Sequence, residues 1–85
     1  MKHYVLITVK DGDEWEDEYF CDEQTAVAEA KYQWQHLSAF EKRHYTTFEL
    51  CEIDDMRPLD EYEWDEWITD HIARTVIDFI REEQK

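Results

Sequence analysis

The sequence predicts a single α+β domain, residues 1–85, with a small, mainly antiparallel three-stranded sheet and two helices in the order ββαβα. Apolar residues alternate over 4–10 and 14–21, and residues 44–53 have β-type composition, which is typical of strands. Over 22–42 and 59–83 apolar residues recur every three or four positions, which is typical of helices. The chain also has four Trp, five Tyr and four Phe with one Gly and one Pro, a composition that favours a packed core over disorder.

The first two strands are expected to form a hairpin. Residues 4–10 are β-branched and alternate, with apolar side chains on both faces, so we expect a well-buried strand. Asp11-Gly12-Asp13 is a turn signal, because glycine adopts positive φ without strain. In the second strand we expect Trp15 and Tyr19, and with them Cys21, to face the core. The acidic residues Glu14, Glu16 and Glu18 then face water.

The first helix is expected to start after Asp22, whose carboxylate suits the N-cap position. Its buried face is predicted by the spacing of Val27, Ala30, Trp34 and Leu37, and we expect it to continue to about Lys42. The segment 44–53 returns to β-type composition. We expect it to pair with the hairpin and to place Phe48 and Leu50 in the core.

A loop around Pro58 is expected to precede a second helix that runs from about Leu59 to Glu83. Its apolar stripe widens toward the C-terminal end. Either the sheet or a second copy of the chain must cover a face this wide. The stripe comprises Trp64, Ile68, Ile72, Val76, Phe79 and Ile80, with Ala73 and Ile77 beside it.

The sequence lacks the patterns that catalysis and metal binding require. The four histidines show no metal-ligand spacing, Ser38 is the only serine, and one glycine cannot build a phosphate loop. The acidic run from Asp11 fails as a calcium loop, because Trp15 and Glu16 occupy the positions of a ligand and the obligatory glycine. We therefore expect a protein that is not an enzyme and holds neither cofactor nor metal; a small enzyme or metal protein is a lesser alternative.

The cytoplasm is the expected location. The apolar run after Met1 is too short for a signal peptide, and no stretch is long enough to cross a membrane. Cys21 and Cys51 are isolated and 30 positions apart, so buried free thiols are favoured over a disulfide.

Charge is the most informative feature of the chain. It has 23 Asp and Glu against 9 Lys and Arg, a formal net charge of -14, which opposes direct binding of a nucleic acid. Three segments hold 16 of the 23 acids. These are the hairpin with Asp11, Asp13, Glu14, Glu16, Asp17 and Glu18; the region with Glu49, Glu52, Asp54 and Asp55; and the start of the last predicted helix with Asp60, Glu61, Glu63, Asp65, Glu66 and Asp70.

Two of these segments are expected to carry rows of carboxylates. Alternate residues on a strand are roughly 6.6 to 6.8 Å apart, which is comparable to neighbouring phosphates along one nucleic-acid strand. Spacings of three and four align acids on one face of a helix. Trp67 is the best candidate for an exposed aromatic contact, although core packing is favoured for it, and Tyr62 is a second candidate. The predicted partner-binding residues are Glu14, Glu16, Asp17, Glu18, Glu63, Glu66, Trp67 and Asp70.

In size, charge and the acidic rows at Glu14, Glu16, Glu18, Glu63, Glu66 and Asp70, the chain resembles small acidic inhibitors encoded by phages and mobile elements, such as anti-CRISPR and anti-restriction proteins that mimic DNA. The resemblance implies that the carboxylates occupy Lys and Arg side chains of a nuclease or another DNA-binding protein, in competition with nucleic acid. Such inhibitors have many unrelated folds, so it implies no particular fold.

Two functional hypotheses follow. In the first, the chain is a non-catalytic binding protein whose acidic surface engages a basic, nucleic-acid-binding partner. In the second, it is a small structural or assembly protein that forms a homodimer through the broad apolar face of the last helix, around Ile72, Val76, Ile77 and Ile80.

Overall fold

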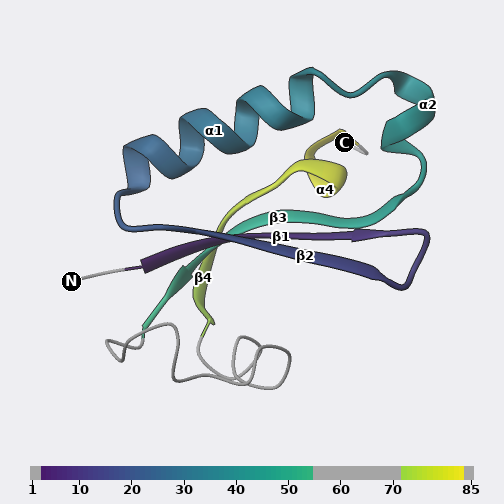
Figure 1. Cartoon of the computed structure of the whole chain (residues 1–85). Helices are drawn as coiled ribbons and strands as arrows, with labels where there is room; N and C mark the ends of the chain where they lie inside the picture. Colours follow the sequence, from purple (N-terminus) through teal and green to yellow (C-terminus); the bar gives the residue numbers. More distant parts are fainter. Residues whose placement is uncertain (1–2, 55–71, 84–85) are drawn as a thin grey trace.

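The computed structural model describes residues 3–54 and 72–83. The elements are β1 (His3–Lys10), β2 (Glu14–Phe20), α1 (Glu23–Gln35), α2 (Ala39–Lys42), β3 (Tyr45–Ile53), β4 (Ile72–Asp78) and α4 (Phe79–Glu83), shown in Figure 1. The strands form one antiparallel sheet in the order β2-β1-β3-β4. The predicted α+β class is confirmed, but these described residues contain four strands and three helices, not the three and two expected.

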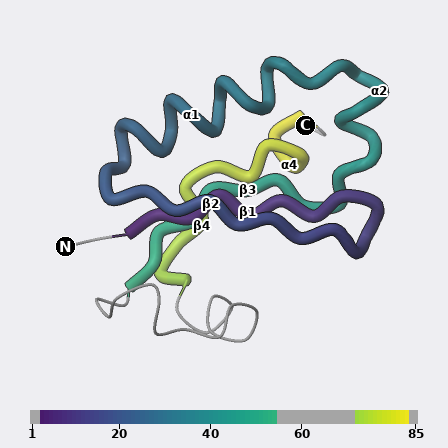
Figure 2. Tube along the Cα trace, viewed as in Figure 1, coloured from purple at the N-terminus to yellow at the C-terminus, as the bar shows by residue number. Residues whose placement is uncertain are grey.

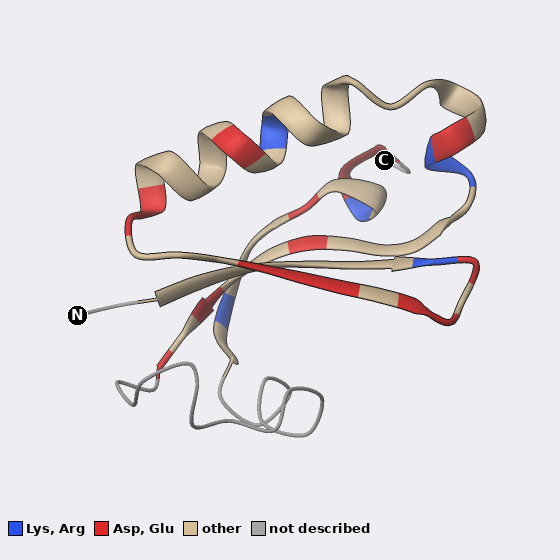
Figure 3. Cartoon of the chain, viewed as in Figure 1, with Lys and Arg blue, Asp and Glu red and all other residues tan. Residues whose placement is uncertain are grey.

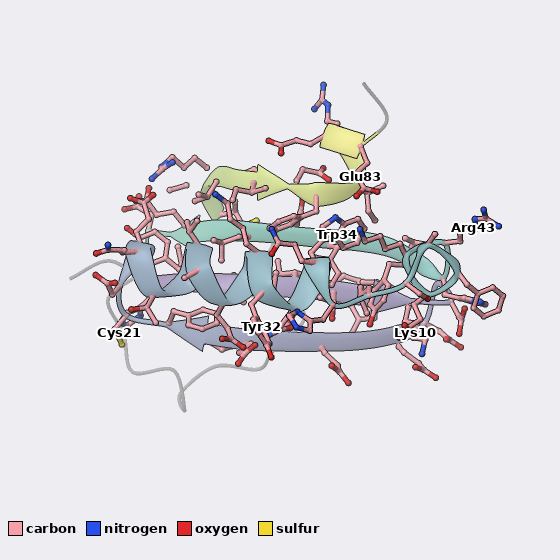
Figure 4. The ribbon with its side chains drawn as sticks, turned by 90° about the horizontal axis from the view of Figure 1, so that it is seen from above. Lys10, Cys21, Tyr32, Trp34, Arg43 and Glu83 are labelled. Atoms are coloured by element: carbon pink, nitrogen blue, oxygen red, sulfur yellow. The ribbon has the colours of Figure 1, made fainter. Side chains whose placement is uncertain are left out.

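The N-terminal strand β1 lies inside the sheet, between β2 and β3 (Figure 2). Helices α1 and α4 lie on the same face of the sheet (Figures 1 and 4). The alternation predicted for β1 is confirmed, because its side chains enter a core on each face. The core under the helices consists of Tyr4, Leu6, Ala26, Ala30, Trp34, Phe48, Leu50 and Phe79.

A second, smaller core occupies the opposite face of the sheet. It is formed by Val5, Ile7, Cys51 and Ile53, and Tyr19 and Ile72 pack against it. Cys51 is therefore buried as predicted, whereas Cys21 is exposed, contrary to expectation, and both thiols are free. Burial, followed in importance by the charge of Glu49, raises the pKa of the Cys51 thiol to about 12, so this cysteine is unreactive at neutral pH.

Helix α1 begins where the sequence predicts. The carboxylate of Asp22 accepts a hydrogen bond from the backbone N–H of Thr25 at 2.8 Å, and this bond is the main reason why the pKa of Asp22 is lowered. The helix ends at Gln35, not at Lys42 as expected. Ser38 and Glu41 form a capping box that starts the separate helix α2, with bonds of 3.1 Å in both directions.

The prediction of a helix up to Glu83 is wrong over residues 72–78. This segment is strand β4, which pairs with β3, and only residues 79–83 are helical. Four of its seven residues, Ile72, Thr75, Val76 and Ile77, are β-branched, and such side chains favour a pleated strand over a helix. Val76, Ile77 and Ile80 pack against the core under the helices. The broad helical face expected around these residues does not form.

The short helix α4 is held by the residue that precedes it and the residue that ends it. Asp78 Oδ1 accepts from the backbone N–H of Arg81 at 3.0 Å. At the other end, Glu83 Oε1 accepts from Lys42 Nζ at 3.1 Å and from Trp34 Nε1 at 3.0 Å. The bond from Lys42 and, second in importance, that from Trp34 lower the pKa of Glu83. Figure 4 shows Glu83 and Trp34 on neighbouring elements on this face of the sheet.

Candidate functional site

The turn between β1 and β2 presents the acidic segment. Asp11 and Gly12 both have positive φ, 56° and 83°, and the backbone N–H of Asp13 donates to Lys10 O at 3.3 Å. This is the turn that Asp-Gly favours in a hairpin, as the sequence predicts. The turn is tied to the start of β3, because Asp11 N–H donates to His44 O at 2.7 Å and Asp11 Oδ1 lies 2.8 Å from His44 Nδ1.

Six of the eight residues 11–18 are acidic, and we call this segment the acidic hairpin. Figure 3 shows acidic residues along β2 and the turn, whereas most Lys and Arg lie on other elements. All six acids are exposed except Asp17, which is partly buried. They are Asp11, Asp13, Glu14, Glu16, Asp17 and Glu18.

The predicted carboxylate row is on one face of β2, but on the opposite face of the sheet from the one expected. Glu14, Glu16 and Glu18 pair with Lys10, Thr8 and Leu6, so they lie on the same face of the sheet as α1. The row stays exposed at the edge of that face. Its last member is fixed to the helix, because Gln33 Nε2 donates to Glu18 Oε2 at 2.6 Å and also to Glu29 Oε1 at 3.2 Å.

The expectation that Trp15 enters the core is wrong, since 57% of the residue is exposed. Trp15 pairs with Val9 near the turn. Tyr19 packs against the smaller core, whereas Trp15 lies beyond the end of that core. Asp17 lies on the same face of β2 as Trp15. An indole in the middle of an acidic segment is an exposed aromatic that the sequence pattern missed. Its position next to the turn, flanked by two glutamates, is the signal that could have revealed it.

Not every predicted acidic cluster is available to a partner. Glu52 is only 6% exposed, and its carboxylate accepts from Arg74 Nε at 3.2 Å and from the Tyr4 hydroxyl at 3.4 Å. Arg74 also binds Glu23 at 2.5 Å. The sequence predicted Glu52 on the acidic surface, but the pairing of β3 with β4 buries its carboxylate against the half-exposed Arg74.

Glu49 lies next to a like charge. It pairs in register with Asp78 across β3 and β4, and its pKa is raised, first by burial and second by the charge of Asp78. A raised folded-state pKa means that the stabilising contribution is fully present below the unfolded pKa, about 4.3, and is lost as the pH rises through the folded pKa.

Glu49→Gln is therefore expected to raise the melting temperature at pH 7, because it removes a carboxylate that ionises unfavourably in the folded state. At pH 4 the variant and the wild type should melt at similar temperatures. Thermal denaturation at both pH values measures the difference. Glu82→Gln, an exposed site on α4, is the control and should change neither value appreciably. A Glu49 variant that is less stable than wild type at pH 7 would contradict the prediction.

The comparison of variant with wild type is needed because other carboxyl groups act in the opposite direction. The pKa values of Asp22, Glu41 and Glu83 are lowered by hydrogen bonds to their charged forms. Their contributions are present above the unfolded pKa and are lost as the pH falls through the folded pKa.

The remaining predicted contact residues, Glu63, Glu66, Trp67 and Asp70, lie outside the described residues, as does Tyr62. In residues 3–54 and 72–83, no group of three or more His, Cys, Asp or Glu is arranged to hold a metal ion. No helix in this part of the chain is long and apolar enough to span a membrane.

A shallow pocket of about 500 Å³ lies between α1, α2 and α4. Its charged groups are largely occupied, because Lys42 binds Glu83 and lies 4.8 Å from the centre of the Trp34 ring. These contacts of Lys42 join the three helices and stabilise the helical layer. The pocket is lined by Trp34, Ala39, Lys42, Arg43, Ile80 and Glu83.

Comparison of the chain with known protein families, curated proteins and solved structures finds no match. The class of protein must therefore be argued from the acidic hairpin itself.

Proposed function

We propose that this chain is a non-catalytic binding protein, located in the cytoplasm, whose acidic hairpin engages a basic surface of a nucleic-acid-binding partner. The observation that carries the proposal is the exposed row of Glu14, Glu16 and Glu18 on the edge strand β2. With carboxylates at alternate strand positions, the row resembles a series of phosphates. Carboxylate–guanidinium pairs would provide the contacts, and binding would compete with nucleic acid, as for an inhibitor that mimics DNA.

Solubility and protection of a sheet edge do not account for this concentration of charge. A small domain needs a net charge of only about 2 to 8 for solubility, whereas this chain has -14. An edge strand is protected from unwanted pairing by one or a few charged side chains. Six acids in eight residues repel one another and favour a partner of opposite charge.

The second hypothesis was a homodimer formed by the apolar face of the last helix. Residues 72–78 do not form that helical face. Ile72 and Ile77 belong to strand β4 and pack against the two cores of the sheet. We therefore do not propose self-association as the function.

The double variant Glu14→Gln, Glu16→Gln is expected to lose its partner. Glu18 is left unchanged because its bond to Gln33 contributes to the fold. In capture experiments from a host lysate, wild type should retain a basic protein that the variant does not. Added nucleic acid should release that protein, and rising salt should weaken its capture, because exposed charges are screened over about 8 Å at physiological ionic strength.

The matched control is Asp54→Asn, Glu82→Gln, which removes the same two charges at exposed positions outside the acidic hairpin. It should capture the partner as wild type does. Equal losses in both double variants would mean that net charge alone matters. Capture that resists both salt and nucleic acid would contradict the proposed function.

A further inference from the structure

The pocket between α1, α2 and α4 has the size and the lining of a small-molecule site. Its volume is about 500 Å³, and ligand pockets usually have volumes of about 300–1,000 Å³. Apolar side chains from all three helices line it, namely Trp34, Ala39 and Ile80. In Figure 4, Trp34, Glu83 and Arg43 lie on the α4 side of the molecule, away from β2. The pocket is therefore separate from the acidic hairpin.

Arg43 is the charged group of this pocket that the fold leaves unpaired. Lys42 Nζ and Trp34 Nε1 both donate to Glu83 Oε1, at 3.1 and 3.0 Å. Within residues 3–54 and 72–83, the exposed guanidinium of Arg43 has neither a hydrogen bond nor an ion pair. Its N–H donors form a planar fork that matches the two oxygens of a carboxylate. The pocket thus places an unpaired carboxylate-binding group beside apolar surface.

The other polar groups of the pocket also favour an anion. The ammonium group of Lys42 has three N–H donors, of which one is used by Glu83. Lys42 and Arg43 against Glu83 leave one positive charge in excess, in a chain whose formal net charge is -14. This excess attracts a monoanion, whereas Glu83 and the net charge of the chain repel a dianion more strongly. A carboxylate therefore fits these charges better than a phosphate group does.

From an unpaired guanidinium at an apolar pocket, we infer that the pocket binds a small organic carboxylate with a flat hydrocarbon body. The carboxylate pairs with Arg43 and accepts from Lys42, and the hydrocarbon packs on Ala39, Ile80 and the accessible edge of Trp34. This site is additional to the proposed function and does not depend on the acidic hairpin. Because the ligand contacts three helices of the folded chain, its binding stabilises the folded state by mass action.

Benzoate is the probe for this site, and its matched analogues are the neutral benzamide and the dianion phenyl phosphate. NMR titration of the backbone and indole N–H signals measures the three affinities. Benzoate should bind at least about tenfold more tightly than benzamide, because only benzoate forms a charge-assisted pair with Arg43. Phenyl phosphate should bind more weakly than benzoate. The signals that move should be those of residues 39–43 and 80–83 and of the Trp34 indole.

Two variants test the pocket, and both change exposed residues, so both should fold. Arg43→Gln should weaken benzoate binding at least about tenfold without weakening benzamide binding. Ala39→Phe fills the pocket but retains every charge, and should abolish the binding of both compounds. The matched control is Arg81→Gln, which removes an exposed arginine of α4 that does not line this pocket. It should bind benzoate as wild type does.

The carboxylate site is overturned if wild type does not bind benzoate, or if it binds benzamide or phenyl phosphate at least as tightly. Equal benzoate affinities of Arg43→Gln and Arg81→Gln overturn it too. None of these outcomes affects the proposed function, because Glu14→Gln, Glu16→Gln leaves the lining of the pocket intact and should bind benzoate as wild type does.

Discussion

Replacing Trp34 with alanine is expected to lower the free energy of unfolding by about 3–5 kcal/mol, the usual cost of removing a buried tryptophan. Trp34 is only 6% exposed and its ring centre lies 4.8 Å from that of Phe48 and 5.8 Å from that of Phe79. The same side chain joins α1 to β3 and α4. Because small domains have total stabilities of about 5–15 kcal/mol, this loss is a large fraction of the total. Urea denaturation followed by circular dichroism measures the loss.

Two variants separate packing from the polar contact of Trp34. Trp34→Phe keeps an aromatic ring but cannot donate to Glu83, and should lose clearly less stability than the alanine variant. Trp15→Ala removes an equally large side chain from an exposed site and should change stability by no more than about 0.5 kcal/mol. If Trp34→Ala and Trp15→Ala unfold at the same urea concentration, Trp34 does not organise the helical layer.

The parts of the fold that could be predicted are those specified by local signals. The turn at Asp11-Gly12, the cap at Asp22 and the β-type composition of β3 each depend on residues close together in the chain, and each of these predictions is confirmed. The break between α1 and α2 also has a local signal, the capping box of Ser38 and Glu41. It was not predicted, because the apolar spacing of α1 continues past Gln35.

Strand β4 could not be recognised from spacing alone. Ile72, Val76 and Phe79 are separated by four and three residues, which fits a helix, and the two register shifts disturb the alternation that would have indicated a strand. Its β-branched composition was the better signal.

The candidate site was predictable as a pattern but not as a set of accessible groups. Spacing correctly predicted that Glu14, Glu16 and Glu18 share one face of a strand. It could not predict which sheet face the helix covers, and so it placed Trp15 in the core. Nor could it identify the partner of Glu52, because Arg74 is 22 residues away and only the β3–β4 pairing brings the two together.

Trp15→Ala is expected to weaken binding of the partner by about 30-fold or more. Tryptophans that anchor interfaces cost about 2 kcal/mol or more when truncated, and each 1.4 kcal/mol corresponds to a factor of ten. Trp15 is 57% exposed within a charged segment, so contact with a partner would remove its ring from water. The loss should arise from faster dissociation, and the salt dependence of association should be unchanged because no charge is removed.

The kinetic contrast with the glutamine variants makes this prediction specific. Glu14→Gln, Glu16→Gln should slow association and flatten its dependence on salt, since these charges steer the encounter. Tyr32→Ala is the comparison variant, because Tyr32 is also 57% exposed but lies on α1, on the sheet face that carries Glu14, Glu16 and Glu18 and opposite to Trp15. Its effect on dissociation should be smaller than that of Trp15→Ala. If surface plasmon resonance showed that Trp15→Ala and Tyr32→Ala dissociate alike, the interface would consist of charge contacts alone and Trp15 would not be its anchor.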